Sequence, residues 1–205
     1  MSSPSSARGS RISRAGARFE YLYTILRGSF KASVATSRGE EQVTGFYLPG
    51  AMLGLDALGT GRHAASLVAT EDSEVCLVAA RHLEQRCASA PQTALRVRGE
   101  LAREIDARRR LMVVLGCKTA EERVASFLVE LASSYVALGQ STQNMSLVLK
   151  RREIGSYLGI TQETVSRVLS GLHDRGVIRL VQKRVSLLDA DGLARLTGDV
   201  KPPAG

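Results

Sequence analysis

The segment over residues 151–175, RREIGSYLGITQETVSRVLSGLHDR, constrains the fold more than any other part of the chain. The sequence predicts a short helix over 153–158, a break at Gly159 and a second helix from Gln162, with Thr161 as its N-cap. The apolar residues that would pack the two helices across this tight turn are Ile154, Leu158, Val165, Val168 and Leu169. The pattern is typical of a helix-turn-helix motif, whose second helix can enter the major groove of DNA.

A basic hairpin is predicted directly after these helices. Two β-branched runs, GVIRLV and RVSLL, are joined by a two-residue turn and form a wing. Lys183 and Arg184 at its tip would reach phosphates. We expect further phosphate contacts from Arg152, Thr161 and Gln162.

One face of the second helix carries side chains that can read bases. Glu163, Ser166 and Arg167 stand at positions i, i+3 and i+4. Arg167 can fork onto guanine, Glu163 can accept from a cytosine amino group, and Ser166 can bond a base or a phosphate. The alternative is a surface ion pair between Glu163 and Arg167, which is common on helices. The neighbouring turn and basic hairpin favour base recognition.

Residues 91–116 predict a long amphipathic helix whose apolar seam could pair with a second copy. Arg108 falls on this seam and would face its symmetry mate, a like-charge cost that acids such as Glu104 could offset. The predicted dimer contacts are Leu101, Ile105, Arg108, Met112 and Leu115. The alternative is an ordinary helix that packs on its own domain.

A further helix is predicted to begin at Thr119, which suits an N-cap, with Glu121 and Glu122 in the first turn and an end at Gly139. Its core stripe would be Val124, Phe127, Leu128 and Leu131. We place the domain boundary near residues 116–119. The C-terminal domain would then span 117–205 and the dimerisation helix 91–116.

Residues 19–90 carry the strand signals: short β-branched runs separated by glycine-containing turns. These predict a small antiparallel β-roll, a cupin-like jelly roll that looks incomplete at its start. The basic stretch 1–18 would be a disordered tail or a partial strand, and we prefer the tail. The predicted class is therefore α+β: a β-roll, a long dimerisation helix and a C-terminal winged helix-turn-helix.

Composition narrows the function. The chain has 205 residues, 44% of them hydrophobic, and a net charge of +8, which nominates nucleic acid as a partner. No run of about 18 to 20 apolar residues could span a bilayer, and no signal peptide is apparent, so we expect a cytoplasmic protein with no membrane partner. No catalytic constellation, such as a Walker loop or HExxH, is present, so we expect no enzyme.

These motifs together resemble the CRP/FNR family of bacterial transcription regulators, and its FNR branch most closely. GITQETVSRVLSGL with the basic hairpin is similar to the family's winged helix, and TAEERVASFL to the helix before it. TGFYLPGAMLGLDALGTGRH resembles the core motif of the branch's roll. The resemblance covers roughly residues 19–198.

The resemblance implies a homodimer whose rolls sense a signal and whose heads bind DNA. Glu163, Ser166 and Arg167 match the reading triad of the FNR branch, which implies an inverted repeat of TTGAT-like half-sites. The Ser37–Glu41 turn resembles a loop that touches RNA polymerase. The alternative function is a ligand-binding or interaction module whose head no longer binds DNA.

Cofactor expectations follow from departures within the resemblance. Leu55 and His63-Ala64 stand where cyclic-nucleotide members carry a glutamate and an arginine-serine pair, so we expect no cyclic AMP. Cys76 matches one ligand of the FNR iron–sulfur cluster, but a cluster needs four, and no cysteine precedes it. A 4Fe–4S cluster is expected only if an upstream cysteine arm is missing from the sequence. His63, His82 and Cys76 are weak candidates for a haem ligand. Cys87 and Cys117 fit small buried hydrophobes or redox thiols.

Overall fold

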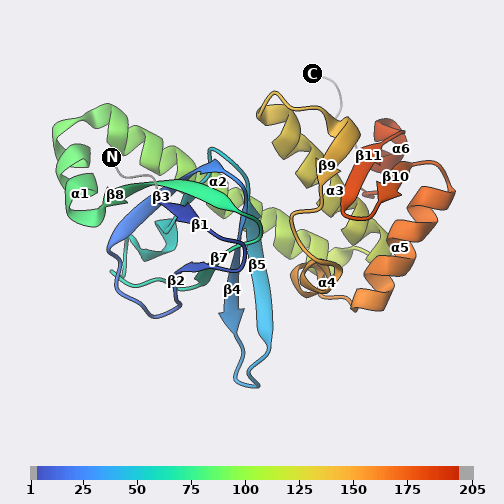
Figure 1. The fold of residues 1–205 in the computed structure, drawn as a ribbon, viewed down its shortest axis with the longest axis horizontal. Helices are drawn as coiled ribbons and strands as arrows, with labels where there is room; N and C mark the ends of the chain where they lie inside the picture. Colours follow the sequence, from blue (N-terminus) through green and yellow to red (C-terminus); the bar gives the residue numbers. More distant parts are fainter. Residues whose placement is uncertain (1–3, 199–205) are drawn as a thin grey trace. The chain divides into compact units, whose positions relative to one another are not determined.

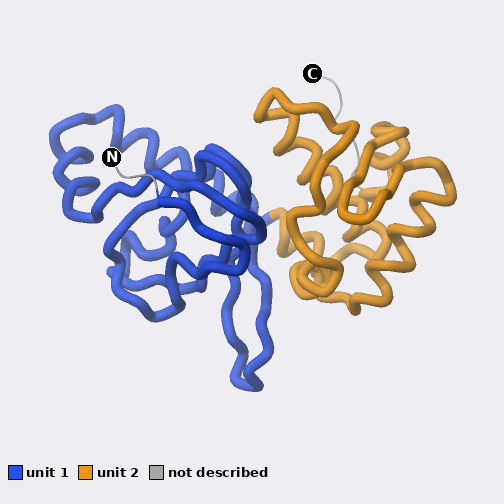
Figure 2. Tube along the Cα trace, in the orientation of Figure 1, with its two compact units in different colours: residues 1–109 blue, residues 110–205 orange. Residues whose placement is uncertain are grey.

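A computed structural model of the protein describes residues 4–198. The chain forms two compact units, residues 1–109 and residues 110–205 (Figures 1 and 2). Helix α2 (Pro91–Cys117) runs through the division between them, which falls after Arg109. The division comes earlier than the boundary expected near 116–119, where α2 ends and the next helix begins. It does so because the first part of α2 packs on the roll, through Val97 and Leu101.

The first unit is a roll of two four-stranded antiparallel sheets. One sheet has the order β1 (Ser5–Ser6), β8 (Ser73–Ala79), β3 (Tyr21–Arg27), β6 (Met52–Leu53). The other has the order β2 (Arg11–Ser13), β7 (Ser66–Ala69), β4 (Phe30–Ala35), β5 (Glu41–Tyr47). Strands distant in sequence are therefore neighbours, as in a jelly roll. The predicted fold class is confirmed.

The roll is built from apolar residues that alternate along short strands. Ile25, Phe30, Leu53 and Val75 are fully buried between the two sheets. Gly28 makes the sharp turn from β3 to β4 possible: its φ is 81°, and a Cβ there would lie 2.7 Å from the carbonyl oxygen of Asp72. The chain break predicted at Arg27-Gly28 is this turn.

Residues 4–18 contain strands. Ser5 pairs with Glu74 and Arg11 with Val68, which adds β1 and β2 to the edges of the two sheets. The strand alternative therefore describes this stretch, and the disordered tail does not. With these two, the roll has eight strands within residues 4–198. The sequence hid these strands because SS and RIS are too short and too polar to show a period of two.

Two helices follow the strands of the roll. The first, α1 (Ala80–Ser89), was not predicted; it buries Leu83 against Leu22 and Leu55. The second is α2, which begins with proline at its first position, where a missing N–H costs nothing. All 27 residues of α2 remain at least partly exposed.

The second unit packs helices against a three-stranded sheet. Helix α3 (Ala120–Ala137) leads to a short 3-10 turn η2 (Thr142–Asn144) and β9 (Met145–Ser146). Helices α4 (Arg151–Leu158) and α5 (Gln162–Asp174) precede β10 (Ile178–Val181), β11 (Arg184–Leu187) and α6 (Ala190–Arg195). The sheet order is β10, β11, β9, so the wing has a third strand that was not predicted, as α6 was not.

The start and core of α3 follow the sequence prediction. Thr119 forms a capping box with Glu122: its Oγ1 accepts from the Glu122 amide at 3.4 Å, and its own amide donates to Glu122 Oε2 at 2.7 Å. Val124, Phe127, Leu128 and Leu131 are at most 1% exposed. Among residues 4–198, no helix is both long and apolar enough to cross a membrane.

Candidate DNA interface

Helices α4 and α5 are joined by a tight turn in which the backbones approach closely. Gly159 ends α4 with a left-handed φ of 63°, and the Thr161 side chain accepts from the Thr164 amide at 3.2 Å to begin α5. A Cβ at Gly155 would lie 2.6 Å from the carbonyl oxygen of Ile160, so only glycine allows this approach. The predicted helix-turn-helix is present, with Thr161 as its N-cap.

The two helices share the predicted apolar contacts. Ile154, Leu158, Val165 and Leu169 are at most 1% exposed, and Val168 is half-buried. Tyr157 adds a link to α3, since its hydroxyl donates to Glu130 Oε2 at 3.2 Å. The apolar contacts therefore fix one face of α5 toward the core and leave the opposite face to solvent.

Arg123 braces the turn, a role that sequence reasoning missed. Its guanidinium donates to three carbonyl oxygens: Leu158 at 2.9 Å, Lys118 at 2.9 Å and Leu115 at 2.7 Å. It thereby ties the ends of α2 and α4 to the start of α3. The sequence did hold a signal for this role: Arg123 lies one turn into α3, next to its apolar face, where a guanidinium needs hydrogen-bond acceptors.

The predicted reading side chains lie on the free face of α5. Glu163 and Arg167 are exposed, and Ser166 is half-exposed. Neither Glu163 nor Arg167 forms an ion pair with any side chain in the described part of the chain, so both keep their hydrogen-bonding capacity. The surface ion pair considered as an alternative is not formed.

The wing places its basic tip as predicted. Val181 of β10 pairs with Arg184 of β11, and Gln182-Lys183 form the two-residue turn. Gln182 has a φ of 54°, the left-handed conformation that such hairpin turns require. Lys183 and Arg184 are exposed, and the Arg184 guanidinium donates to the carbonyl oxygen of Asn144 at 3.2 Å.

A basic cleft of about 620 Å³ lies between the wing and the start of α4. It combines Lys183 and Arg184 with Lys150 and Arg151, and no acidic residue lines it. Lys150 and Arg151 were not predicted. Their signal was the run Lys150-Arg151-Arg152, which the turn into α4 brings beside the wing. Arg152, Thr161 and Gln162 are exposed, and none of them lines this cleft.

The predicted dimer residues divide along α2. Ile105 and Met112 are 50% and 72% exposed, as a free seam requires, and Leu95 and Val113 join them at 55% each. Leu101 instead packs on the roll. In the second unit, Leu115 comes within contact distance of the position a Cβ would take at Gly159.

Arg108 does not project freely from α2. Its guanidinium bonds Glu104, the Tyr47 hydroxyl and the carbonyl oxygen of Thr44, all within its own roll. The charge is thus partnered inside the protomer, which removes the like-charge cost expected at a symmetric seam.

The three cysteines lie in three different elements of the described part of the chain. Cys76 lies in β8, Cys87 in α1 and Cys117 at the end of α2. Within residues 4–198, no three His, Cys, Asp or Glu side chains gather in a way that could hold a metal ion. The donor set around Cys76 therefore does not fit a cluster with four thiolate ligands.

Comparison with known proteins agrees with this geometry. Residues 122–196 match the Crp-like helix-turn-helix domain family, and residues 5–90 match the cyclic nucleotide-binding domain family. The chain is 39% identical to the transcriptional regulatory protein btr of Bordetella pertussis, over 86% of this chain and 73% of that protein. It is 36% identical to the transcriptional activator protein anr of Pseudomonas aeruginosa, over 93% of this chain and 78% of that protein. The solved structure of FixK2 from Bradyrhizobium japonicum superimposes with a TM-score of 0.90 at 31% identity, covering 98% of both chains.

Proposed function

We propose, since the chain belongs to the CRP/FNR family of DNA-binding transcription regulators, that it acts in the cytoplasm as a homodimer on an inverted repeat of TTGAT-like half-sites. Members of this family are regulators and not enzymes. The observation that carries the proposal is the exposed face of α5, which bears Glu163, Ser166 and Arg167, in the same unit as a basic cleft between the wing and the start of α4.

Each reading side chain has a distinct part. The Arg167 guanidinium donates two hydrogen bonds to O6 and N7 of one guanine, and the Glu163 carboxylate accepts from a cytosine amino group. Ser166, one turn from Glu163, bonds a base edge or a phosphate. An arginine and a glutamate that are both unpaired can read the two strands of one or two neighbouring base pairs.

The phosphate backbone is held on both sides of α5. Lys183 and Arg184 approach it from the wing, and Lys150, Arg151 and Arg152 from the start of α4. Thr161 and Gln162 add polar contacts at the N-terminus of α5, where the helix dipole favours a phosphate. These contacts set affinity and register, and the base contacts set sequence preference.

Dimerisation is assigned to the exposed apolar stripe of α2. The stripe is formed by Leu95, Ile105, Met112 and Val113, each at least 50% exposed. Burial of this stripe against a second copy is favourable and also presents two α5 helices to successive turns of DNA, about 34 Å apart.

Two further features belong to the proposal. The turn over Ser37–Glu41, at the end of the long β4–β5 hairpin in Figure 1, is the surface assigned to RNA polymerase. A 4Fe–4S cluster is assigned to this regulator only if a cysteine arm precedes the present sequence, since Cys76 alone cannot hold one.

The test measures binding of the full chain to three duplexes by fluorescence anisotropy over a salt series. One duplex carries the inverted repeat, one keeps a single half-site and one is scrambled. We expect the inverted repeat to bind about 10³-fold more tightly than the scrambled duplex, and two protomers per repeat in sedimentation. Equal affinity for all three would overturn sequence-specific binding and favour the module with a degenerate head. One protomer per repeat would overturn the homodimer.

A further inference from the structure

Four arginines lie along one edge of the roll, and the proposed function makes no use of them. Arg11, Arg14 and Arg18 belong to the N-terminal stretch that contains the edge strand β2, and Arg62 belongs to the loop before β7. We call these four residues the arginine edge. All of them are exposed, and none forms an ion pair in the part of the chain that the structure describes.

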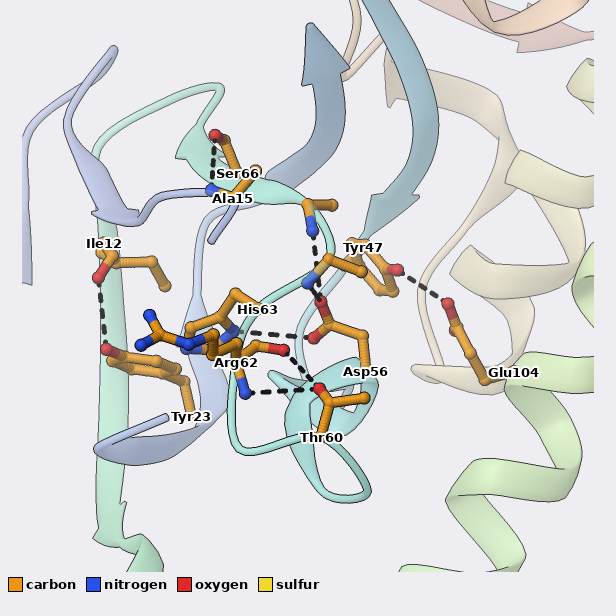
Figure 3. Close-up of polar contacts among 12 residues, drawn as sticks. Ile12, Ala15, Tyr23, Tyr47, Asp56, Thr60, Arg62, His63, Ser66 and Glu104 are labelled. Carbon is orange, nitrogen blue, oxygen red and sulfur yellow. Dashed lines mark hydrogen bonds and ion pairs between the residues drawn. The ribbon is translucent and has the colours of Figure 1, made fainter. Parts of the chain in front are cut away.

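The two segments that carry the arginine edge are bonded to each other. Arg18 pairs with Arg62 in an isolated antiparallel bridge. The Ala15 amide donates to Ser66 Oγ at 3.1 Å, a contact visible in Figure 3. The Arg62 guanidinium donates through Nη1 to the carbonyl oxygen of Gly16 at 2.8 Å. The arginine edge is therefore a fixed part of the roll, and its charges are held close together.

The positive charge of this edge is not balanced by acids. The two segments, residues 9–19 and 57–70, contain no Asp or Glu. The acids at their borders are Glu20, Asp56 and Glu71. Asp56 Oδ2 already accepts from two loop amides, at 2.6 Å and 3.3 Å, and Glu71 Oε1 accepts from a serine hydroxyl at 2.6 Å. The bridge also places two arginines directly opposite each other, and like charges in that position destabilise a strand pair. An anionic partner would offset this cost.

The composition of the edge fits a phosphate backbone better than a protein surface. All four cations are arginines, whose planar guanidinium can bond two phosphate oxygens at once. The residues between Arg14 and Arg18 are Ala, Gly and Ala, so little bulk keeps a partner away. Protein interfaces are usually anchored by large aromatic or aliphatic side chains. Within residues 9–19 and 57–70, no large hydrophobic residue is exposed to provide such an anchor.

We propose that the arginine edge binds the sugar–phosphate backbone of duplex DNA without reading its sequence, as a contact additional to that of the helix-turn-helix. The phosphates supply the counter-charge that the two segments lack. Two sources offer the same phosphates: the DNA that flanks the half-sites, and a separate duplex. A role for this edge rests on the proposed function, because the helix-turn-helix is what brings DNA to the protein.

The test compares two double variants of the full chain. Arg14→Gln/Arg18→Gln removes two charges from the arginine edge and keeps Arg62, whose guanidinium holds its own loop. The matched control, Arg81→Gln/Arg86→Gln, removes the same charge from exposed positions of α1 in the same unit. We expect the edge variant to unfold at the same temperature as the parent chain or higher, because it removes one of the two facing charges.

The first measurement tests the flanking DNA by fluorescence anisotropy over a salt series. One duplex ends at the inverted repeat, and the other extends about 20 base pairs, or two helical turns, beyond it on each side. The parent chain and the control should bind the extended duplex about tenfold more tightly at low salt, with a steeper salt dependence. For the edge variant, the slope of log affinity against log salt on the extended duplex should fall by about 2 per protomer, since each lost phosphate contact is worth about 0.9. Binding to the short duplex should not change.

The second measurement tests a separate duplex. The protein is first saturated with the unlabelled short repeat and is then titrated with a labelled scrambled duplex. If the parent chain and the control bind the labelled duplex and the edge variant does not, the arginine edge contacts a second DNA molecule.

Equal behaviour of the edge variant and the control in both measurements would overturn the proposal. If, in addition, the edge variant alone bound RNA polymerase holoenzyme more weakly, the partner of this edge would be a protein and the assignment to DNA would be wrong. A parent chain that bound the repeat and a scrambled duplex equally would instead overturn the proposed sequence-specific function. The salt slopes of the two variants would still decide whether the arginine edge contacts phosphates.

Discussion

The two compact units carry their functional groups in different ways. In the second unit, the side chains proposed to read bases come from one helix and stand within five positions of one another, over Glu163–Arg167. In the first unit, the Tyr47 hydroxyl bonds Glu104, 57 positions away, and Arg108, 61 positions away. These side chains meet only because α2 packs on the roll. A group of side chains on one helix can therefore be located from its spacing in the sequence. A group that joins distant segments can be located only once the tertiary fold is known.

The largest expected effects test whether the units are stabilised separately. Phe127→Ala in α3 and Phe30→Ala in β4 remove phenylalanines that are 1% and 0% exposed. Each should lower the free energy of unfolding of its own unit by about 3–5 kcal/mol, because a cavity is left in a packed core. Urea unfolding followed by hydrogen exchange would assign the loss to a unit. A loss spread over both units in either variant would contradict separate stabilisation.

A smaller effect is expected from the brace of the helix-turn-helix. Arg123→Ala removes the donor of three carbonyl hydrogen bonds and should destabilise the second unit by about 2–3 kcal/mol. Affinity for the inverted repeat should fall as well, although Arg123 lies outside the reading face. The control is Arg195→Ala, whose side chain is 73% exposed and which should change stability by less than about 0.5 kcal/mol. Equal unfolding midpoints for Arg123→Ala and the parent chain would show that these hydrogen bonds do not contribute to stability.

Two further variants, Arg167→Ala and Lys183→Ala, should distinguish base reading from phosphate binding. Arg167→Ala should cost about 1–3 kcal/mol of binding to the repeat and relax preference at one base position. Lys183→Ala should weaken all duplexes alike and reduce the slope of log affinity against log salt by about 1. Anisotropy with single-base variants of the repeat measures both. If Lys183→Ala relaxed the sequence preference, the wing would be reading bases.

The smallest expected effect lies in the roll and depends on pH. Tyr47→Phe removes a hydroxyl that joins Glu104 and Arg108, at a cost of about 1 kcal/mol near neutral pH. Burial raises the pKa of Tyr47 in the folded state, so its contribution is complete below about pH 10 and is lost as pH rises above that value. The variant should therefore lose less stability than the parent chain between pH 9 and pH 11. Parallel pH profiles of urea unfolding would contradict this role.

The C-terminal half was largely predictable because each local signal agreed with the fold. The cap at Thr119, the stripe from Val124 to Leu131 and the break at Gly159 are each set by neighbours close in sequence. Lys150 and Arg151 were missed because their importance comes from the wing, which reaches them only through the β9–β11 pairing.

The N-terminal half was less predictable for a different reason. Strands β1 and β2 are two and three residues long and are held by partners in β8 and β7, so tertiary pairing decides their structure. Arg108 was placed on a dimer seam by helical counting alone. Counting could not reveal that Gly45, on a strand far away in sequence, leaves room for its guanidinium.

The close approach at Gly155 has a consequence for how regulation can be lost. A glycine inside a helix destabilises it by about 0.5–1 kcal/mol relative to alanine. At Gly155 of α4 an alanine methyl group would overlap the carbonyl oxygen of Ile160, so glycine is required there despite this cost. We expect a single added carbon at this position to displace α5 while every side chain proposed to contact DNA remains in the sequence. The basic surface of the protein would be unchanged, so we expect DNA binding without sequence preference to remain while sequence-specific binding is lost.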